Sequence, residues 1–311
     1  MIGPILGGVL LLFGWPWLFW VNIPITLLII ALGMRLLPIG GGNQALRFDW
    51  WGAGVLSIML VCAAIVLQEV GTMLAQPQWT PTPLAVGASI GLLVSSAIFV
   101  PVERRASDPI IQLDLFARRQ ILLILAFAFG AGIAEAVTLY VPSLLVSAHG
   151  MSESTASFQL IPLVFAMAIA SPLSGRMLDA RGAKPVVITG VVLMSIGLLV
   201  LAWWPTQLTM YYLFSVLFGL GIAVLLGAAL RYMMLGETEP SQRAPAQALL
   251  TITISVGQMI GAAMMGAIAG AQADATAGYA SAMLVTAYLM CGLVVLGIWL
   301  KPAVPPVTAT P

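Results

Sequence analysis

The chain has 311 residues, of which 61% are hydrophobic and only 7% are charged, and its mean hydropathy is +1.07. Soluble domains carry about 25% charged and about 45–50% apolar residues, so the composition excludes a soluble enzyme and indicates an integral membrane protein. The net charge of +1, without a basic run, gives no sign of nucleic-acid binding. The single histidine, His149, and the two cysteines, Cys62 and Cys291, form no cluster of metal-ligand spacing, so neither a metal nor a cofactor is predicted.

Apolar runs in chain order predict the membrane-spanning helices, each of which needs about 20 mostly apolar residues. The predicted fold class is an all-α integral membrane bundle with one partial span at 1–13 and nine full spans. The nine lie at 17–37, 52–75, 83–101, 121–146, 155–177, 185–204, 209–231, 248–270 and 281–300. Because the first run is too short to cross a bilayer, we expect either the back part of a longer protein or an internally assigned start.

The basic residues predict the orientation of these spans. All 12 Lys and Arg residues fall in or beside alternate connections or in the tail, and the other connections have none. Since basic loops stay in the cytoplasm, these connections and the C-terminus are predicted there, in a multi-pass protein of the inner or plasma membrane. The long connection at 102–120 fits either an amphipathic helix on the inner leaflet or a plain linker. The Pro-rich tail at 302–311 is predicted to be disordered.

One connection concentrates charge between two apolar runs. Residues 175–184 read Gly-Arg-Met-Leu-Asp-Ala-Arg-Gly-Ala-Lys and are expected to form a short loop with a tight turn. Cations alone would fix the topology of such a loop, so Asp179 suggests a further role. Its carboxylate could pair with Arg176 or Arg181, or it could accept hydrogen bonds from a helix N-terminus. The pattern G-x-x-x-D-x-R-G-x-K resembles the loop signature of the major facilitator superfamily. The resemblance implies a cytoplasmic gate loop made by Gly175, Asp179, Arg181, Gly182 and Lys184.

Three more segments resemble one branch of that family, the fourteen-span drug:proton antiporters. Gly3, Pro4, Gly7 and Gly8 match the G-P-x-x-G-G element of the fifth span of its antiporters. The run 19–25 looks like the opening of the sixth span, although Pro16 replaces the usual basic residue between two tryptophans. The run 109–116 resembles the loop that follows two inserted middle spans. The resemblance therefore implies an N-terminally truncated member, lacking four spans of the N-terminal half.

The same resemblance implies the domain organisation. Residues 1–37 would end the N-terminal half, residues 38–120 would hold the two inserted spans and a linker, and residues 121–301 would form the six-helix C-terminal half before the tail at 302–311. The two triplets in 121–204 and 209–300 start on opposite sides of the membrane, as an inverted repeat requires.

Glu135 is the candidate for proton coupling because it is the only acidic residue near the centre of a predicted span. A charge at that depth costs about 2.5–3.5 kcal/mol on insertion scales, so the carboxyl group must face a cavity, be paired or be protonated. The alternative is a protonated carboxyl group that hydrogen-bonds a backbone carbonyl. Gln258, Tyr140 and Gln159 are the other candidate cavity residues, while Gly257 and Gly261 favour close helix packing.

The predicted function is secondary active transport: proton-coupled, multidrug-type efflux of small apolar or cationic compounds, with the direction and driving ion implied by the resemblance. The alternatives are a truncated remnant that does not transport, and an exporter of another class such as a lipid, sugar or siderophore. An enzyme is not predicted, because no nucleophile–base or metal-ligand set is present. The implied partners are a small-molecule substrate, protons, the lipid bilayer and a missing N-terminal segment.

Overall fold

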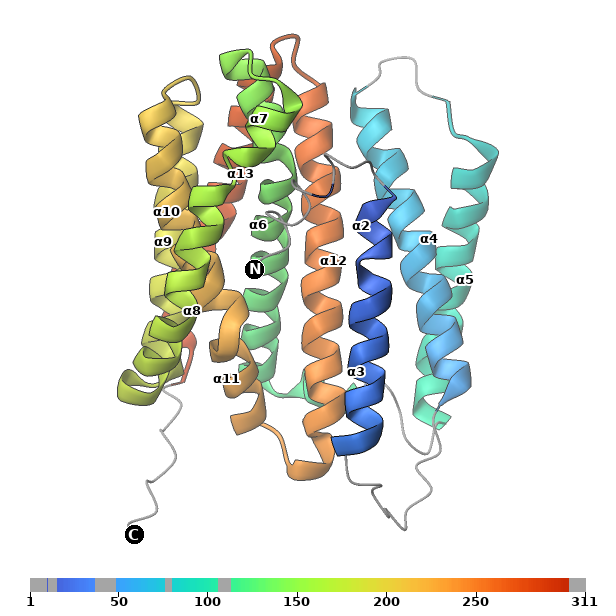
Figure 1. The fold of residues 1–311 in the computed structure, drawn as a ribbon. Coiled ribbons are helices and arrows are strands. Elements are labelled where there is room, and N and C mark those ends of the chain that lie inside the picture. The colour runs from blue at the N-terminus through green and yellow to red at the C-terminus, as the bar shows by residue number, and fades with distance from the viewer. Residues whose placement is uncertain (1–9, 11–15, 37–48, 76–79, 106–112, 302–311) are drawn as a thin grey trace.

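The computed structural model describes residue 10 and residues 16–36, 49–75, 80–105 and 113–301. Within these ranges every regular element is a helix, and the long helices run side by side (Figure 1). Eight helical segments are long and apolar enough to cross a membrane. This confirms an all-α membrane bundle and matches eight of the predicted spans, because runs of about 20 apolar residues leave the helix as the form that satisfies the backbone in lipid.

The helices have the following bounds. They are α2 (Trp17–Trp20), α3 (Asn22–Leu36), α4 (Trp50–Ala75), α5 (Pro83–Arg105), η1 (Leu113–Ala117), α6 (Arg119–His149), α7 (Glu153–Phe158), α8 (Ile161–Arg181), α9 (Ala183–Trp203), α10 (Leu208–Val224), η2 (Leu225–Ala229), α11 (Leu230–Gly236), η3 (Pro240–Gln242), α12 (Arg243–Gly270), α13 (Ala275–Leu296) and η4 (Gly297–Trp299). The ninth predicted span, 17–37, corresponds to α2 and the shorter apolar helix α3.

Two predicted spans are not continuous α-helices. The span at 155–177 is divided into α7 and α8, and Pro162 stands in the first turn of α8, where its missing N–H costs no helical bond. The span at 209–231 passes through the π-helical segment η2, where Gly227 has non-helical torsion angles of φ −70° and ψ −136°. Hydropathy alone predicts no such break, because it does not register the path of the backbone.

The loop between α5 and α6 is anchored to the bundle. Its described part, η1, is a short 3₁₀ turn in which Leu115 is fully buried and belongs to the hydrophobic core. Phe116 beside it is 39% exposed. Both interpretations of the whole connection stay predictions, because residues 106–112 lie outside the described part.

Helices α6 and α12 form the tightest described crossing in the bundle. A Cβ atom built on Gly257 of α12 would lie 2.2 Å from the carbonyl oxygen of Phe129, and one built on Gly261 would lie 2.7 Å from Ile133. Gly132 of α6 is equally close to the backbone of Ile254. The packing role expected of Gly257 and Gly261 is therefore confirmed, since larger residues would force the two backbones apart.

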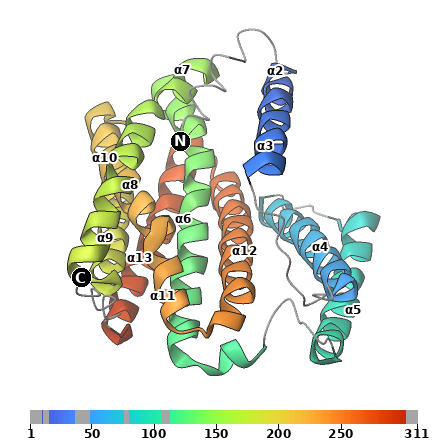
Figure 2. The ribbon, with the colours of Figure 1, turned by 60° about the horizontal axis from the view of Figure 1, so that its bottom comes forward.

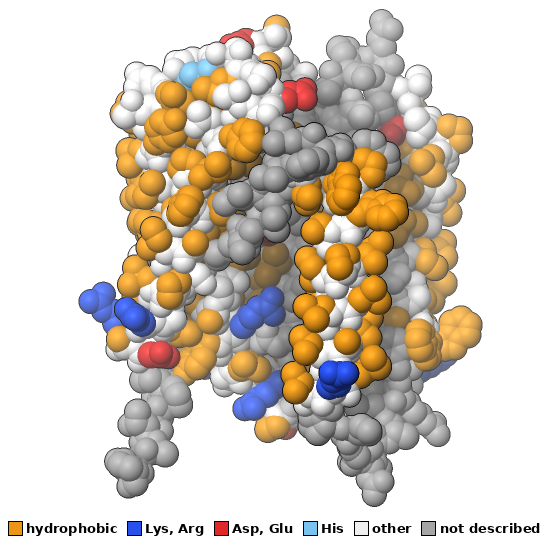
Figure 3. Space-filling view, in the orientation of Figure 1, with side chains coloured by type: hydrophobic (Ala, Val, Ile, Leu, Met, Phe, Trp, Pro, Cys, Tyr) orange, Lys and Arg blue, Asp and Glu red, His pale blue; other side chains and the backbone are white. Residues whose placement is uncertain are grey.

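Charge and tryptophan mark the two ends of the bundle. Figure 3 shows Lys and Arg in the lower part of the view, an end called here the basic end. The described cations of the basic end lie at helix ends or connections: Arg35, Arg104, Arg105, Arg118, Arg119, Arg176, Arg181, Lys184, Arg231, Arg243 and Lys301. This sorting agrees with the predicted alternation of the loops, and the cytoplasmic location of the basic end stays a prediction. Exposed tryptophans such as Trp51 and Trp203 lie at helix ends, as in interfacial belts.

Figures 1 and 2 agree in placing the α4–α5 pair beside α12, at the edge of the group formed by α6 and α8–α13. Helix α4 packs on α5 and on α12. The two helices that the resemblance assigns to a middle insertion therefore contact the six-helix group through α12.

Candidate functional site

Glu135 lies in the middle of α6, in a stretch of small and mostly buried residues. Its side chain is half-buried, and its carboxylate makes no hydrogen bond or ion pair with the residues that the structure describes. The Thr138 hydroxyl donates a hydrogen bond of 2.7 Å to the backbone carbonyl of Glu135, not to the carboxylate. The structure thus places an ionisable group at membrane depth, and no described residue pairs with it.

Gln258 lies on α12, where that helix crosses α6. Its backbone nitrogen would be 2.8 Å from a Cβ atom built on Gly132, which precedes Glu135 by three residues. The side chain of Gln258 is half-buried, and no described residue bonds its amide. The crossing therefore brings the turns that carry Glu135 and Gln258 together.

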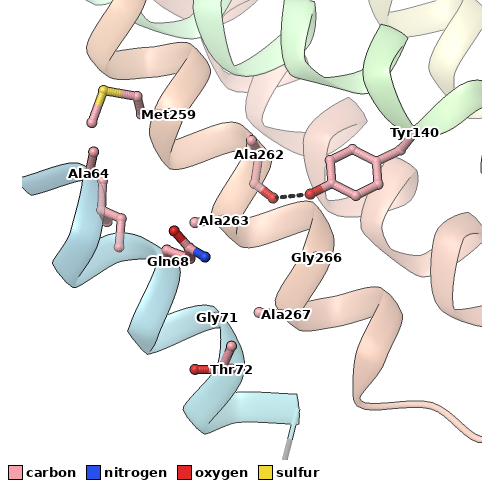
Figure 4. Close-up of a pocket in the computed structure, with 11 residues that line it drawn as sticks. Ala64, Gln68, Gly71, Thr72, Tyr140, Met259, Ala262, Ala263, Gly266 and Ala267 are labelled. Carbon is pink, nitrogen blue, oxygen red and sulfur yellow. Dashed lines mark hydrogen bonds between the residues drawn. The ribbon is translucent and has the colours of Figure 1, made fainter. Parts of the chain in front are cut away.

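Tyr140 lies about one and a half turns beyond Glu135 on α6, away from the basic end. Its hydroxyl donates a hydrogen bond of 2.8 Å to the Ala262 carbonyl (Figure 4). Its ring lies 6.2 Å from the Tyr279 ring, centroid to centroid. Tyr140 lines a cavity of about 440 Å³ between α4 and α12. Neither Glu135 nor Gln258 lines that cavity, so the candidate residues do not form one pocket there.

Gln159 is hydrogen-bonded to two tyrosines of another helix, and its expected place in a cavity stays a prediction. It lies between α7 and α8, where the Tyr211 hydroxyl donates to its backbone carbonyl and the Tyr212 hydroxyl donates to its side-chain oxygen at 3.0 Å. Tyr211 is fully buried. Gln159 is therefore held at the junction of two helices, and the aromatic partners come from α10, which no local sequence signal reveals.

The predicted loop at 175–184 is almost entirely helical, and that part of the prediction is wrong. Helix α8 continues to Arg181, and α9 begins at Ala183, so Gly182 alone joins them with φ +78°. The positive φ explains why glycine stands there. At Gly175, by contrast, an added Cβ atom would meet nothing within 4 Å, so no described neighbour requires glycine there.

The charged residues of this segment divide into two groups. Asp179, Arg176 and Arg181 are exposed and make no hydrogen bond or ion pair with described residues, so the suggested pairing of Asp179 within the segment is absent there. Lys184 instead donates a hydrogen bond of 2.9 Å to the Ile298 carbonyl near the C-terminal end of α13. A cation at that end satisfies a free carbonyl group and complements the helix dipole.

The antiporter element made by Gly3, Pro4, Gly7 and Gly8 lies outside the described residues, as does most of the predicted partial span. Its expected role stays a prediction.

Eight membrane-length apolar helices define a multi-pass helical membrane protein. Residues 122–311 match the family described as the Major Facilitator Superfamily. The chain belongs to this superfamily, which confirms the resemblance drawn from its motifs. The superfamily is one of transporters.

The chain is also similar to curated relatives of the drug-efflux branch. It is 26% identical over 276 residues to "Multidrug resistance protein 3" of Bacillus subtilis, covering 86% of this chain and 52% of the relative. It is 29% identical over 281 residues to "Multidrug resistance protein Stp" of Mycobacterium tuberculosis, covering 88% and 50%. The chain thus spans about half the length of the curated relatives it matches.

Among solved structures, the chain is similar to a bacterial homologue of the human lysosomal transporter Spinster, in an inward-facing and occupied conformation. The TM-score is 0.49 at 17% sequence identity, and the likeness covers 79% of this chain and 66% of that one.

Proposed function

We propose that this chain takes part in the proton-coupled efflux of small apolar or cationic compounds across the cell membrane, with the basic end and the C-terminus in the cytoplasm. The single observation that carries the proposal is Glu135, a half-buried carboxyl group in mid-span without a described partner. The names of the relatives support drug efflux as the direction of transport.

In the proposed cycle Glu135 alternates between a protonated and a charged form. Desolvation penalises the charged form of a carboxyl group, whereas contact with water or a cationic substrate favours it. A carboxyl group that meets water on one side of the membrane and cargo on the other therefore exchanges a proton for the cargo. Gln258, on the neighbouring turn of α12, is proposed to hydrogen-bond the cargo or the protonated carboxyl group.

The gate is proposed to use the exposed end of α8. Asp179 and Arg181 stand free of described partners, so both are available to bind a second element when the basic end closes. Charge-assisted hydrogen bonds are the stronger kind, and their rupture would accompany opening. Lys184 contributes by holding α9 to α13, so that the charged turn moves with the helix bundle as one body.

Proteoliposomes with an imposed proton gradient test the coupling. We expect Glu135→Gln to abolish gradient-driven ethidium export while the protein still inserts, because glutamine keeps the size but does not release a proton. The matched control is Glu239→Gln, an exposed residue between α11 and η3. Export by Glu135→Gln at the rate of the control would remove the coupling role.

The gate has its own test. Asp179→Asn removes the charge and is expected to slow export several-fold without changing topology. Topology is measured by labelling a cysteine placed at the exposed position 180 with a reagent added on either side of the membrane. Unchanged export would reduce the charges of this segment to a topology signal. Because the chain covers about half of its relatives, each assay is run with the chain alone and with co-expression of the unmatched part of the Bacillus relative.

A further inference from the structure

A narrow cavity separates α4 from α12 in the part of the bundle away from the basic end, and it is called here the α4–α12 slot. Its volume is about 440 Å³, within the range of small-molecule sites. Figure 4 shows that α4 forms one wall and α12 the other, with Tyr140 of α6 at the side.

The walls of the slot are built from small residues. Ala64 and Gly71 contribute from α4, and Ala263, Gly266 and Ala267 contribute from α12. A Cβ atom built on Gly71 would lie only 3.5 Å from the Ala263 carbonyl, so the two helices come together at that point. Leu67 of α4 and Met259 of α12 line the slot as well, so its walls are mostly apolar and come closest where the small residues face each other.

The slot also holds polar groups that its walls do not use. The amide of Gln68 lies between the two helices in Figure 4 and forms no hydrogen bond with any described residue. Thr72 donates its hydroxyl hydrogen to the Glu69 carbonyl, and Tyr140 donates to Ala262, so each keeps only the capacity to accept. The Gln68 side chain is exposed, so its amide is available to hydrogen-bond a molecule that enters the slot.

The slot adjoins a second cavity of about 330 Å³. Tyr140 and Gly266 line both spaces, and Tyr279 lines the second. The Tyr140 ring, fixed by its hydrogen bond to Ala262, therefore stands at the boundary of the two. A molecule in the slot lies beside Tyr140, which favours an aromatic ligand.

We propose that the α4–α12 slot binds apolar aromatic compounds that carry one hydrogen-bonding group, with Gln68 bonding that group. This gives α4 a part in ligand binding, outside the site around Glu135. The identification of the bound compound as cargo rests on the proposed function, whereas the binding itself does not.

The test uses photo-crosslinking with 4-hydroxybenzophenone, which combines two aromatic rings with a carbonyl and a hydroxyl group. The whole chain is placed in phosphatidylcholine nanodiscs without any proton gradient, irradiated at subsaturating probe, and mapped by peptide mass spectrometry. We expect adducts to concentrate in residues 64–72 and 259–267. Gln68→Leu should lower their yield about fivefold, as the loss of one neutral hydrogen bond implies, and Ala263→Phe should abolish them by filling the slot.

The control is Val61→Phe, which adds the same ring to α4 at a side chain that is 59% exposed, outside the slot. Adducts spread evenly along exposed helix faces, or a yield unaffected by both slot variants, would overturn the proposal. So would labelling of the slot by a phospholipid with a benzophenone acyl chain but not by the free probe, since the occupant would then be lipid. The slot of the Glu135→Gln variant should be labelled by the probe as in the parent chain. Failed coupling and failed slot binding are therefore separate results. Gln68→Leu adds no bulk, so it remains informative even if Ala263→Phe misfolds.

Discussion

The crossing of α6 and α12 makes a graded prediction about three glycines on one helix. An added Cβ atom would meet backbone at 2.2 Å at Gly257 and at 2.7 Å at Gly261, but only the Tyr140 hydroxyl at 3.2 Å at Gly266. Backbone does not yield to a methyl group, whereas the end of a side chain does. The cost of substitution by alanine should therefore fall in the order 257, 261, 266.

The size of the stability change on each glycine-to-alanine substitution follows from two opposing effects. Alanine in place of glycine favours a helix by about 1 kcal/mol, whereas overpacking a close contact costs about 1–3 kcal/mol. At Gly257 relief of the clash requires α6 and α12 to separate by roughly 1 Å, an overpacking shift of the costly kind. Gly292 of α13 has nothing within 4 Å of an added Cβ atom, so Gly292→Ala shares the helix gain without the clash. The difference between Gly257→Ala and Gly292→Ala is thus expected to be about 1–3 kcal/mol.

The measurement is unfolding in mixed micelles titrated with sodium dodecyl sulfate, followed by tryptophan fluorescence. We expect Gly292→Ala to be at least as stable as the parent, Gly266→Ala to lie near it, and Gly257→Ala to be the least stable of the series. If Gly257→Ala gains as much stability as Gly292→Ala, the two helices do not cross at these residues and the reasoning about the site on α6 fails with it.

Five further substitutions test three features of the fold by the same unfolding measurement. Gly182→Ala should cost about 2–3 kcal/mol, because φ +78° with ψ 174° is a region open almost only to glycine. Gly150→Ala, at φ +63° and ψ 23°, should cost about 1–2 kcal/mol. Equal costs for the two substitutions would contradict the one-residue turn at Gly182. Tyr211→Phe should cost about 1 kcal/mol by removing the buried hydroxyl that bonds Gln159, and an unchanged midpoint would show that this junction needs no clamp. Asp274→Ala should cost about 1 kcal/mol because its carboxylate caps the start of α13, and Asp274→Asn should recover most of that loss.

The sequence predicts the number and order of the long helices well because apolar length is a property of each segment by itself. Where charge limits a span, the prediction is less accurate. Arg176, Asp179 and Arg181 suggested a loop, yet all three belong to α8. Long side chains at a helix end reach water while their backbone stays helical, so a charged stretch does not by itself end a helix.

Contacts between distant segments escaped sequence reasoning for a different physical reason. Gln159 is polar in an apolar region, which suggests a cavity, but its hydrogen bonds go to Tyr211 and Tyr212 of another helix. The break at Gly227 is equally invisible, since glycine is common in membrane helices and most such glycines serve packing. Only the positions of the neighbouring helices distinguish these roles.

The direction of the Glu135 side chain is the clearest example of a feature that depends on the neighbouring helices. On α6, Phe129, Gly132, Ile133 and Ala136 face α12, whereas Gly130 faces α13. With 3.6 residues per turn, Glu135 lies about 140° around the helix from Gly130 but only about 60° from Gly132. Its side chain is therefore directed away from α13 and lies at the flank of the α12 contact, and the glycines that fix the α12 contact also fix this direction. A bulky residue at the crossing would rotate or displace α6, so the packing glycines and the unpaired carboxylate form one arrangement, and the substitutions that test stability at Gly257 also test how Glu135 is presented.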